Sequence, residues 1–323
     1  MSRSFEACLS NFFNKYLSLE LNSSKNTIIS YKCTFSLLIN YLIKEKDFKL
    51  NDITFEKINK DVILSFLDYL ENNKSNSINT RNQRLGAIKS FYQYSLTLTE
   101  NIDQIYNIKQ ILNIKNKKFT KKTQDYLTKE EIKSIFDSIN TNKEIGRRNL
   151  TILVLLYDSA ARADEIVNLC VEDIRYYDNQ IILNGKGNKK RVVPIMDETI
   201  ELLNQYLKDN NINYGKIFKV SEKNNTFIKD IIKSVTKSLS INKNITPHTF
   251  RRTRATHLLE AGVSIIYIKD LLGHSSIETT EEYLKINNKY KNEAIKKANE
   301  LLPKTSLPDW SKDETLLNQL LNL

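Results

Sequence analysis

The chain has 323 residues, enough for two domains of ordinary size, and its 49 Lys and Arg against 38 Asp and Glu give a formal charge of +11. This basic excess favours a polyanionic partner, either nucleic acid or an anionic membrane surface, although it is also compatible with solubility alone. No segment approaches the roughly 18 apolar residues that span a bilayer, and residues 1–21 lack the apolar core of a signal peptide. We therefore expect a cytoplasmic protein that does not enter a membrane.

The sequence contains no pattern typical of a metal centre or a nucleotide cofactor. Its three cysteines, Cys8, Cys33 and Cys170, are far apart and form no CxxC pair, which predicts reduced packing residues without a disulfide framework. No Walker loop or dinucleotide fingerprint occurs. We expect neither a metal ion nor an organic cofactor.

The N-terminal part of the chain has the apolar spacing of helices. The apolar residues that recur at helical intervals near its start are Phe5, Leu9, Phe12, Phe13 and Tyr16. Ser24 is a good N-cap for a second helix, and residues 61–70 and 80–96 have the pattern of two more. These elements predict a small helical bundle over residues 1–108.

A basic segment, residues 109–125, follows this bundle. Residues 109–122 hold six lysines and no acidic residue, with few strong core residues among them. We predict an interdomain linker that runs close to a phosphate backbone, and a merely solvated linker is the alternative. The candidate phosphate contacts in this segment are Lys117, Lys118 and Lys121.

Residues 126–308 form a second predicted domain with a mixed pattern. Thr128 and Glu131 form a capping box that begins its first helix, and residues 149–159 have the composition of a buried helix. One β-rich stretch interrupts the helical spacing, which then resumes near Glu198 and continues toward the C-terminus. The predicted fold class is therefore mainly α with a small antiparallel β-sheet.

The β-rich stretch, residues 178–195, has the pattern of a hairpin with a glycine-rich tip. Gly185 and Gly187 flank Lys186 and would let the tip approach another backbone closely. An ammonium group delivered in this way can neutralise charge or donate a proton to a leaving oxygen. The alternative for Lys186 is a solvent-exposed basic turn.

A second candidate anion site lies at the start of a predicted helix. Thr246 is a plausible N-cap and Pro247 a plausible first helical residue. His248 and Arg251 then fall on one face of the first turn, where free N–H groups and the positive end of the helix dipole favour an anion. The alternative is a surface histidine and arginine on a basic helix.

Arg162 follows the buried helix and lies close in sequence to Glu165. The two residues could form a plain ion pair, or the glutamate could orient the arginine toward a phosphate group. The residues by themselves leave both alternatives open.

The last candidates lie toward the C-terminus. His274 follows Gly273, which we expect to end a short helix over residues 265–272, and Tyr283 comes nine residues later. Tyr283 taken alone would be assigned to packing. His257 lies within a helix beside two leucines, and we assign it to structure.

In this order and at these spacings, the candidates resemble the tyrosine recombinases, or phage integrase family, particularly its Xer-like and transposon-encoded branch. The resemblance covers residues 126–290 strongly and the N-terminal bundle more loosely. The matching segments are YDSAARADEIVNL, NGKGNKKRVVPI, HTFRRTRATHLLEAG and LLGHSSIETTEEYL. The family implies a helical core-binding (SAM-like) bundle followed by an α+β catalytic domain.

The resemblance implies that Arg162 and Arg251 bind the non-bridging oxygens of the scissile phosphate. It implies that Lys186 protonates the leaving 5′ oxygen. Ala161 departs from the family pattern, because a bulkier leucine is usual before the arginine, and this could alter how Arg162 is held.

The remaining roles are implied in the same way. His248 and His274 would hydrogen-bond the phosphate, with His248 a candidate proton acceptor. Tyr283 would be the nucleophile that forms a 3′-phosphotyrosyl bond, a reaction that requires neither metal nor ATP in this family.

The implied partner is double-stranded DNA with inverted-repeat recombination sites, held in a C-shaped clamp. On the last bundle helix, Arg81, Arg84 and Lys89 are candidate contacts to this DNA, and a solvated helix face is the alternative. The resemblance also implies a monomer in solution, a homotetramer in the synaptic complex, possible accessory recombination proteins, and the nucleoid of a bacterial cytoplasm.

The C-terminal tail, residues 309–323, has the pattern of a short docking helix. Ser311 and Glu314 form a capping box, and Leu316, Leu317, Leu320 and Leu321 form an apolar stripe that is too short to be stable alone. By family precedent, we expect this helix to dock on an adjacent subunit. Docking on its own domain is the alternative.

The implied biological role is integration and excision of a mobile element, as in transposition. Xer-like resolution of chromosome or plasmid dimers is the second choice. A non-catalytic DNA-binding protein that kept the fold and a topoisomerase-like relaxing enzyme are further alternatives.

Overall fold

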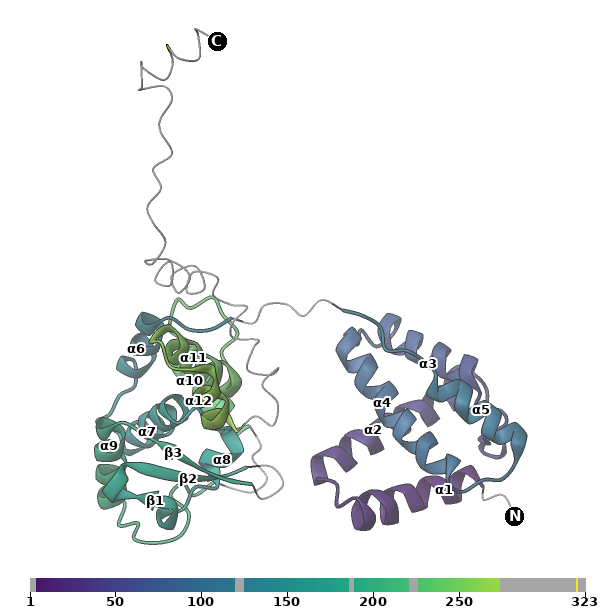
Figure 1. The fold of residues 1–323 in the computed structure, drawn as a ribbon, viewed down its shortest axis with the longest axis horizontal. Coiled ribbons are helices and arrows are strands. Elements are labelled where there is room, and N and C mark those ends of the chain that lie inside the picture. Colours follow the sequence, from purple (N-terminus) through teal and green to yellow (C-terminus); the bar gives the residue numbers. More distant parts are fainter. Residues whose placement is uncertain (1–3, 120–124, 186–188, 221–225, 274–317, 319–323) are drawn as a thin grey trace. The chain divides into compact units, whose positions relative to one another are not determined.

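The computed structural model of the chain describes residues 4–119, 125–185, 189–220, 226–273 and 318 (Figure 1). The chain divides into two compact units, Met1–Lys122 and Thr123–Leu323. Each unit has a separate hydrophobic core, as expected for a domain.

In its described residues, 4–119, the first unit is built from helices and the loops that join them. Its elements are α1 (Phe5–Asn11), the π-helix η1 (Phe12–Glu20), α2 (Lys25–Glu45), the 3₁₀ turn η2 (Leu50–Asp52), α3 (Lys60–Asn72), α4 (Ile78–Leu96) and α5 (Ile102–Leu112). Short polar side chains cap α1 to α5, each accepting a hydrogen bond from the backbone N–H three residues on; these caps are Ser4, Ser24, Asn59, Ser77 and Asn101. The helices predicted at residues 61–70 and 80–96 are confirmed and begin one or two residues earlier.

Aromatic rings form the centre of the first unit. Phe12 lies edge-on to Phe91 with ring centroids 5.5 Å apart, and Phe35 contacts the same Phe91 ring at 5.1 Å. Edge-to-face pairs of this kind contribute about 0.5–1.5 kcal/mol each beyond the burial of their surface. These contacts join η1, α2 and α4 into one bundle.

The core of the first unit extends beyond residue 108, where the predicted bundle ends. Ile108, Ile111 and Ile114 are all buried in it. The Asn82 amide then donates to the carbonyl of Lys117 at 2.9 Å and accepts from its N–H at 3.1 Å. The chain is therefore attached to the first unit as far as Lys117, because apolar residues at helical spacing lie between the lysines of the basic segment.

In its described residues, 125–185, 189–220 and 226–273, the second unit combines helices with a small sheet. Its helices are α6 (Lys129–Asp137), α7 (Glu144–Asp158), α8 (Ala163–Val167), α9 (Asp197–Asp209), α10 (Phe227–Thr236), α11 (Pro247–Glu260) and α12 (Ile265–Leu272), with 3₁₀ turns η3 (Val171–Asp173) and η4 (Tyr176–Asp178). The predicted capping box is confirmed, since the Thr128 hydroxyl accepts from the Glu131 N–H and the Glu131 carboxylate accepts from the Thr128 N–H.

The sheet is antiparallel, with strand order β1 (Ile174–Arg175), β2 (Gln180–Asn184) and β3 (Lys190–Pro194). In the β2–β3 hairpin, Ile181 pairs with Val193 and Leu183 pairs with Arg191. Ile181, Leu183 and Val193 are fully buried, so one face of the hairpin packs on the core while the alternate residues point outward. The predicted hairpin is confirmed, and its tip at residues 186–188 lies outside the described residues.

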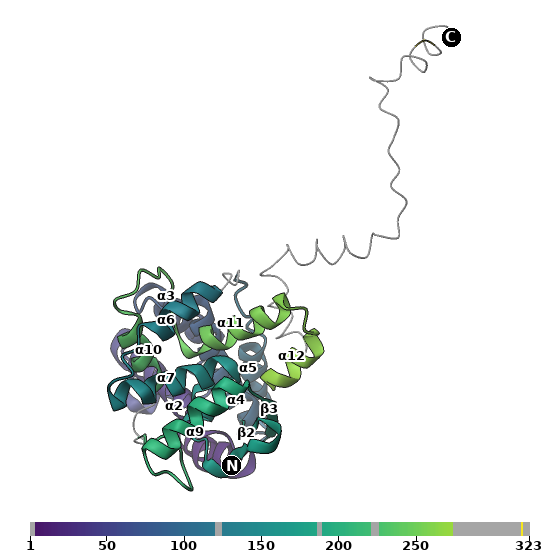
Figure 2. The same ribbon diagram turned by 90° about the vertical axis from the view of Figure 1, so that its left-hand side faces the viewer.

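α12 closes the second unit against α11 and the end of α7. In both views α11 and α12 lie side by side (Figures 1 and 2), and Ala255 of α11 packs with Ile268 and Leu272 of α12 and with Ala160. α12 also contacts β3, and α8 contacts β2. The end of the hairpin, the start of α8 and the end of α12 therefore meet in one place. The predicted fold class, mainly α with a small antiparallel sheet, is confirmed.

Across residues 4–119, 125–185, 189–220 and 226–273, no helix is both long and apolar enough to cross a bilayer. The same described ranges hold no cluster of three or more His, Cys, Asp or Glu side chains placed to bind a metal ion.

Candidate active site

The turn between α7 and α8 forms one wall of the candidate site. Ala160 has a φ of +48°, in the left-handed region that costs a non-glycine residue on the order of 1 kcal/mol. The Ser159 hydroxyl stabilises the turn by donating to the Leu155 carbonyl at 2.5 Å and accepting from the Ala161 N–H at 3.3 Å. Ala161, where the family usually has leucine, is fully buried here in the core of the unit.

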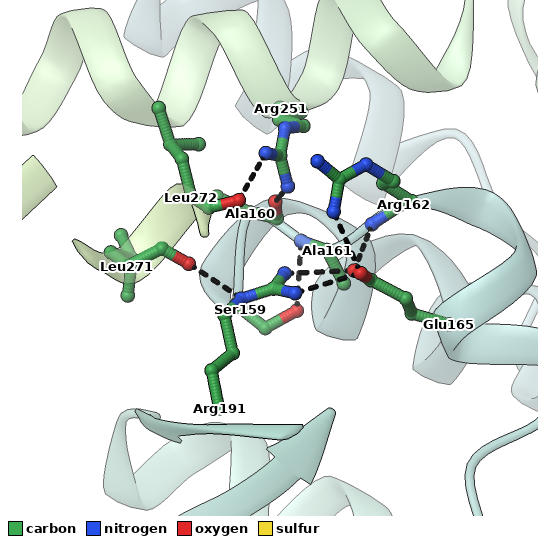
Figure 3. A network of polar contacts seen from close by, with 9 residues as sticks. All are labelled: Ser159, Ala160, Ala161, Arg162, Glu165, Arg191, Arg251, Leu271 and Leu272. Carbon is green, nitrogen blue, oxygen red and sulfur yellow. Dashed lines mark hydrogen bonds and ion pairs between the residues drawn. The ribbon is translucent and has the colours of Figure 1, made fainter. Parts of the chain in front are cut away.

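Arg251 lies in the first turn of α11, which begins as predicted with Thr246 as N-cap and Pro247 as the first helical residue. The Arg251 residue is only 4% exposed. Its Nη1 donates to the Ala160 carbonyl at 2.7 Å, and its Nη2 donates to the Leu272 carbonyl (Figure 3). The guanidinium therefore joins the turn after α7 to the end of α12.

Arg162 lies at the N-cap of α8, and Glu165 holds it at two points. The Arg162 backbone N–H donates to Glu165 Oε2 at 2.7 Å, and Arg162 Nη1 donates to Glu165 Oε1 at 2.9 Å. The Arg162 side chain stays 36% exposed while that of Glu165 is 3% exposed. The buried Glu165 carboxylate therefore orients the Arg162 guanidinium, and the exposed part of that guanidinium can still contact a ligand.

His248 lies on the same first turn of α11 as Arg251, and its side chain reaches the surface. Its pKa lies below the ordinary histidine value, first because of partial desolvation and then because Arg251, Arg252 and Arg162 place positive charge nearby. The imidazole is therefore mainly neutral at pH 7 and can accept a proton. His248 and Arg251 lie three residues apart on α11, so their side chains share one face near the start of this helix.

Arg191 of β3 was not among the predicted site residues, yet it connects Glu165 to the end of α12 in this network. Its Nη1 and Nη2 donate to the two Glu165 carboxylate oxygens at 2.7 and 2.8 Å, and its Nε donates to the Leu271 carbonyl at 2.9 Å (Figure 3). One signal in the sequence pointed to it. Arg191 alternates with the buried Val193 and so lies on the inward face of the hairpin, where a charge needs a partner.

Glu165 is ionised in this environment. Burial acts to raise the pKa of its carboxyl, but hydrogen bonds from Arg191 and from the Arg162 backbone outweigh burial and bring the pKa to about 2. The carboxylate therefore carries a full negative charge at neutral pH and holds two guanidinium groups.

The structure brings together Arg162, His248 and Arg251 of the six predicted catalytic residues. Lys186, His274 and Tyr283 lie outside the described residues, as does Lys121 of the basic segment. His257, which was assigned to structure, is buried and its Nδ1 lies 2.8 Å from the Tyr157 hydroxyl; this assignment is confirmed.

The predicted DNA contacts of the first unit occupy different environments. Arg84 is half-buried and its Nη1 donates to the Ser30 carbonyl and the Thr34 hydroxyl, which joins α4 to α2. Lys89 is half-buried, and Lys118 is exposed. Lys117 is exposed, and its ammonium contacts Glu71 at 2.8 Å and Asp68 at 3.8 Å.

Arg81 does not fit the prediction of a DNA contact, because it is 3% exposed and its Nε lies 3.0 Å from a Glu71 carboxylate oxygen. The spacing of α4 explains this placement. Leu85, Ile88 and Tyr92 follow Arg81 at four, seven and eleven residues and are all buried, so Arg81 belongs to the core-facing stripe of its helix.

Replacing Arg81 with alanine should therefore destabilise the protein by about 3 kcal/mol, since it leaves the largely buried Glu71 carboxylate with the exposed Lys117 in place of a buried guanidinium. Lys117→Ala removes an exposed partner of the same Glu71 and should cost less than about 1 kcal/mol. Urea unfolding of the full chain measures both. The plot of log DNA affinity against log salt concentration has a slope that counts phosphate contacts. If Arg81→Ala lowered this slope by about one and left stability unchanged, Arg81 would be a phosphate contact after all.

Comparison with known proteins identifies the family. The model of the phage integrase family matches residues 125–289, and that of the phage integrase SAM-like domain matches residues 8–107. The chain is 31% identical over 290 residues to the tyrosine recombinase XerD of Oceanobacillus iheyensis, covering 86% of this chain and 93% of the relative. It is 30% identical over 299 residues to the tyrosine recombinase of Pseudothermotoga lettingae, covering 90% of this chain and 98% of the relative.

Solved structures share the fold at lower identity. The XerH recombinase in a post-cleavage complex with a palindromic difH substrate matches with a TM-score of 0.64 and 19% identity, covering 91% of this chain and 83% of that one. The Tn1549 transposon integrase in complex with transposon right-end DNA matches with a TM-score of 0.65 and 15% identity, covering 90% of this chain and 98% of that one. The chain therefore belongs to the phage integrase family, the tyrosine recombinases.

Proposed function

We propose that this protein is a site-specific recombinase that cleaves and rejoins duplex DNA through a 3′-phosphotyrosyl intermediate on Tyr283. The observation that carries the proposal is the convergence of Arg162 and Arg251 (Figure 3), with His248 near the start of the same helix as Arg251, at the junction of α8, α11 and α12. Two cations and a proton acceptor are the groups that attack on a phosphodiester by a phenol requires.

The chemistry follows from the charges involved. A phosphodiester is anionic and resists attack by an electron-rich oxygen, and two guanidinium groups neutralise it and stabilise the charge of the transition state. Tyrosine has a reference pKa of about 10, so Tyr283 needs a proton acceptor, which His248 supplies. Lys186 donates a proton to the departing 5′ oxygen and His274 hydrogen-bonds the phosphate.

The step conserves the energy of the broken linkage. A phosphotyrosyl ester replaces the phosphodiester, and a 5′ hydroxyl from a partner strand reverses the reaction by displacing the tyrosine. Exchange between two duplexes therefore needs no external energy source, only the placement of the second 5′ end.

Trapping the covalent adduct tests this proposal. A pool of duplexes with randomised inverted repeats, nicked so that the cleaved end diffuses away, is incubated with the full chain and resolved under denaturing conditions. Wild type should form an adduct that mass spectrometry maps to the peptide containing Tyr283, and the attached DNA identifies the recombination site. Tyr283→Phe should bind the same DNA without forming an adduct, whereas Tyr214→Phe, at an 83% exposed position, should react normally. An adduct on any other residue overturns the assignment.

The two units are proposed to clamp the DNA, with the basic segment between them. Arg84, Lys89, Lys117 and Lys118 are the described candidates for phosphate contact, and Lys121 belongs to the same proposal. The biological role proposed first is integration and excision of a mobile element in a bacterial cytoplasm, and Xer-like resolution of dimers is second. Plasmids that carry two copies of the site identified by the trapped adduct distinguish recombination from DNA relaxation. Only a recombinase exchanges the DNA segments that flank the two sites.

We further propose that the protein assembles as a tetramer on paired sites, with the tail at residues 309–323 docked on an adjacent subunit. A groove of about 500 Å³ between β3, α11 and α12 supports this, since most of its lining residues are apolar and suit a leucine stripe, with Asp158, Arg191, Arg254 and Asp270 also in its lining. The residues that line the groove include Val192, Ile195, Leu258, Tyr267, Ile268 and Leu271.

Deleting residues 309–323 should then weaken cooperative binding to a two-site duplex on the order of 10²-fold, while binding to a single site changes little. Leu258→Glu, which places a charge in the groove, should reproduce this pattern. Gel-shift titrations on one-site and two-site duplexes measure both constants. Equal losses on the two duplexes would instead indicate a tail that docks on its own domain.

A further inference from the structure

We propose that Arg191 is a positioning residue for strand cleavage, which orients Arg162, the end of α12 that leads to His274, and the base of the Lys186 hairpin at the same time. This inference rests on the function proposed above and adds to it a residue that bears no catalytic role of its own.

The first connection runs through Glu165. The Arg191 guanidinium meets both carboxylate oxygens in a two-pronged pair, and the same carboxylate accepts from the backbone and side chain of Arg162. The Glu165 and Arg191 side chains are 3% and 12% exposed, so solvent competes little for these contacts. A bidentate arginine–carboxylate pair fixes the plane of the carboxylate and therefore the direction in which Arg162 is held.

The second connection runs to the end of α12. Arg191 Nε donates to the Leu271 carbonyl at 2.9 Å, and the neighbouring Leu272 carbonyl accepts from Arg251. These are carbonyls of the last helical turn, which the helix itself leaves without partners. Two arginines on different elements therefore fix the point from which the chain continues through Gly273 to His274.

Gly273 shows how close this approach is. It has a φ of +60°, and a Cβ atom built on it would lie 3.0 Å from Arg191 Cδ. A side chain at position 273 would therefore both strain the backbone and displace Arg191. The lack of a side chain at Gly273 thus leaves the space that Arg191 of β3 occupies.

The third connection is to the hairpin. Arg191 follows Lys186 by five residues. The described hydrogen bond next to the tip joins Gly185 and Lys189, with the Gly185 N–H donating to the Lys189 carbonyl at 2.9 Å. A Cβ atom on Gly185 would lie 3.4 Å from Glu165 Oε1 and 3.7 Å from Arg191 Nη1. The base of the hairpin that carries Lys186 therefore rests on the same ion pair that holds Arg162.

We assign Arg191 to positioning because each of its three guanidinium nitrogens already donates to an oxygen of the protein and its side chain is only 12% exposed. Lysine cannot replace it, since an ammonium group lacks the planar fork that meets two carboxylate oxygens and a carbonyl together. Misplacement of reacting groups by about 1 Å can cost about 10²-fold in rate.

The test compares Arg191→Lys with Arg254→Lys in the full chain. Arg254 is a matched control, because it also forms a largely buried pair, with Asp158 at 2.6 Å, and its side chain is 20% exposed. The readouts are the single-turnover rate of adduct formation at saturating nicked DNA, the DNA dissociation constant and the unfolding midpoint. Arg191→Lys should slow adduct formation about 10²-fold with DNA affinity nearly unchanged, whereas Arg254→Lys should keep the rate.

A double variant covers the case in which Arg191→Lys does not fold. Glu165→Gln with Arg191→Met removes both charges, so no buried ion is left without a partner, and the fold should be recovered while the slow cleavage remains. Wild-type rates in Arg191→Lys or in the double variant, or an equal loss in Arg254→Lys, overturn the inference while leaving the proposed function intact. Absence of any adduct with wild type overturns the proposed function, and this inference with it.

Discussion

Replacing Arg251 with alanine is expected to slow strand cleavage about 10²–10³-fold, the cost of removing one preorganised donor from a developing anionic transition state. Arg251 is buried at the junction of three elements, and its guanidinium also holds the carbonyls of Ala160 and Leu272. The variant therefore loses a cation and, in addition, the tie between the α7–α8 turn and the end of α12. Arg251→Lys should retain the charge and still cleave slowly, because an ammonium group cannot span both carbonyls.

The measurement is the single-turnover rate on the nicked substrate at saturating DNA, so that a change in affinity does not enter the result. Lys208→Ala is the control, since this lysine is exposed in the last turn of α9. Its rate should stay near that of wild type. Near-normal cleavage by Arg251→Ala would remove Arg251 from the proposed site.

Glu165→Gln is expected to lower the free energy of unfolding at pH 7 by about 3 kcal/mol, because it leaves the largely buried Arg191 without a counter-charge. The pKa of Glu165 gives the pH dependence of this loss. Its folded-state pKa of about 2 lies below the reference of 4.5, so the stabilisation is fully present above about pH 4.5 and is lost as the pH falls toward 2. The difference between wild type and Glu165→Gln should therefore shrink across that window.

Urea titrations at pH 7, 4 and 3 measure this difference. Asp164→Asn removes the same charge from an exposed neighbouring position on α8 and should change stability by no more than about 0.5 kcal/mol at any of these pH values. A Glu165→Gln variant as stable as wild type at neutral pH would show that the carboxylate does not support the arginine pair.

Local patterns in the sequence predicted the parts of the site that depend on near neighbours. The Thr246 cap and the three-residue spacing of His248 and Arg251 place both side chains on the first turn of α11, because helical geometry alone determines that relation. The hairpin and the capping box at Thr128 were predictable for the same reason. The ion pair of Arg162 with Glu165 was also predictable as one of two alternatives, since the two residues are three positions apart.

The sequence could not indicate what Arg191 contacts. Its partners come from residues 165 and 271, and they meet only after the hairpin packs on α8 and α12. Arg81, which was predicted as a DNA contact and is buried in the structure, illustrates the same limit in the opposite direction. A charged residue on a core-facing stripe resembles an exposed one until its buried partner, Glu71, is known from the packing of α3 against α4.

The sequence by itself determined the family, the order of the helices and the hairpin, and the identity of the candidate catalytic residues, because these depend on side-chain type and short spacings. Only the tertiary structure decided which charges are buried, which carbonyls they hold, and which residue joins the separate parts of the site. The physical reason is that the desolvation of a charge and the geometry of its hydrogen bonds depend on every element that packs around it, and those elements are distant along the chain.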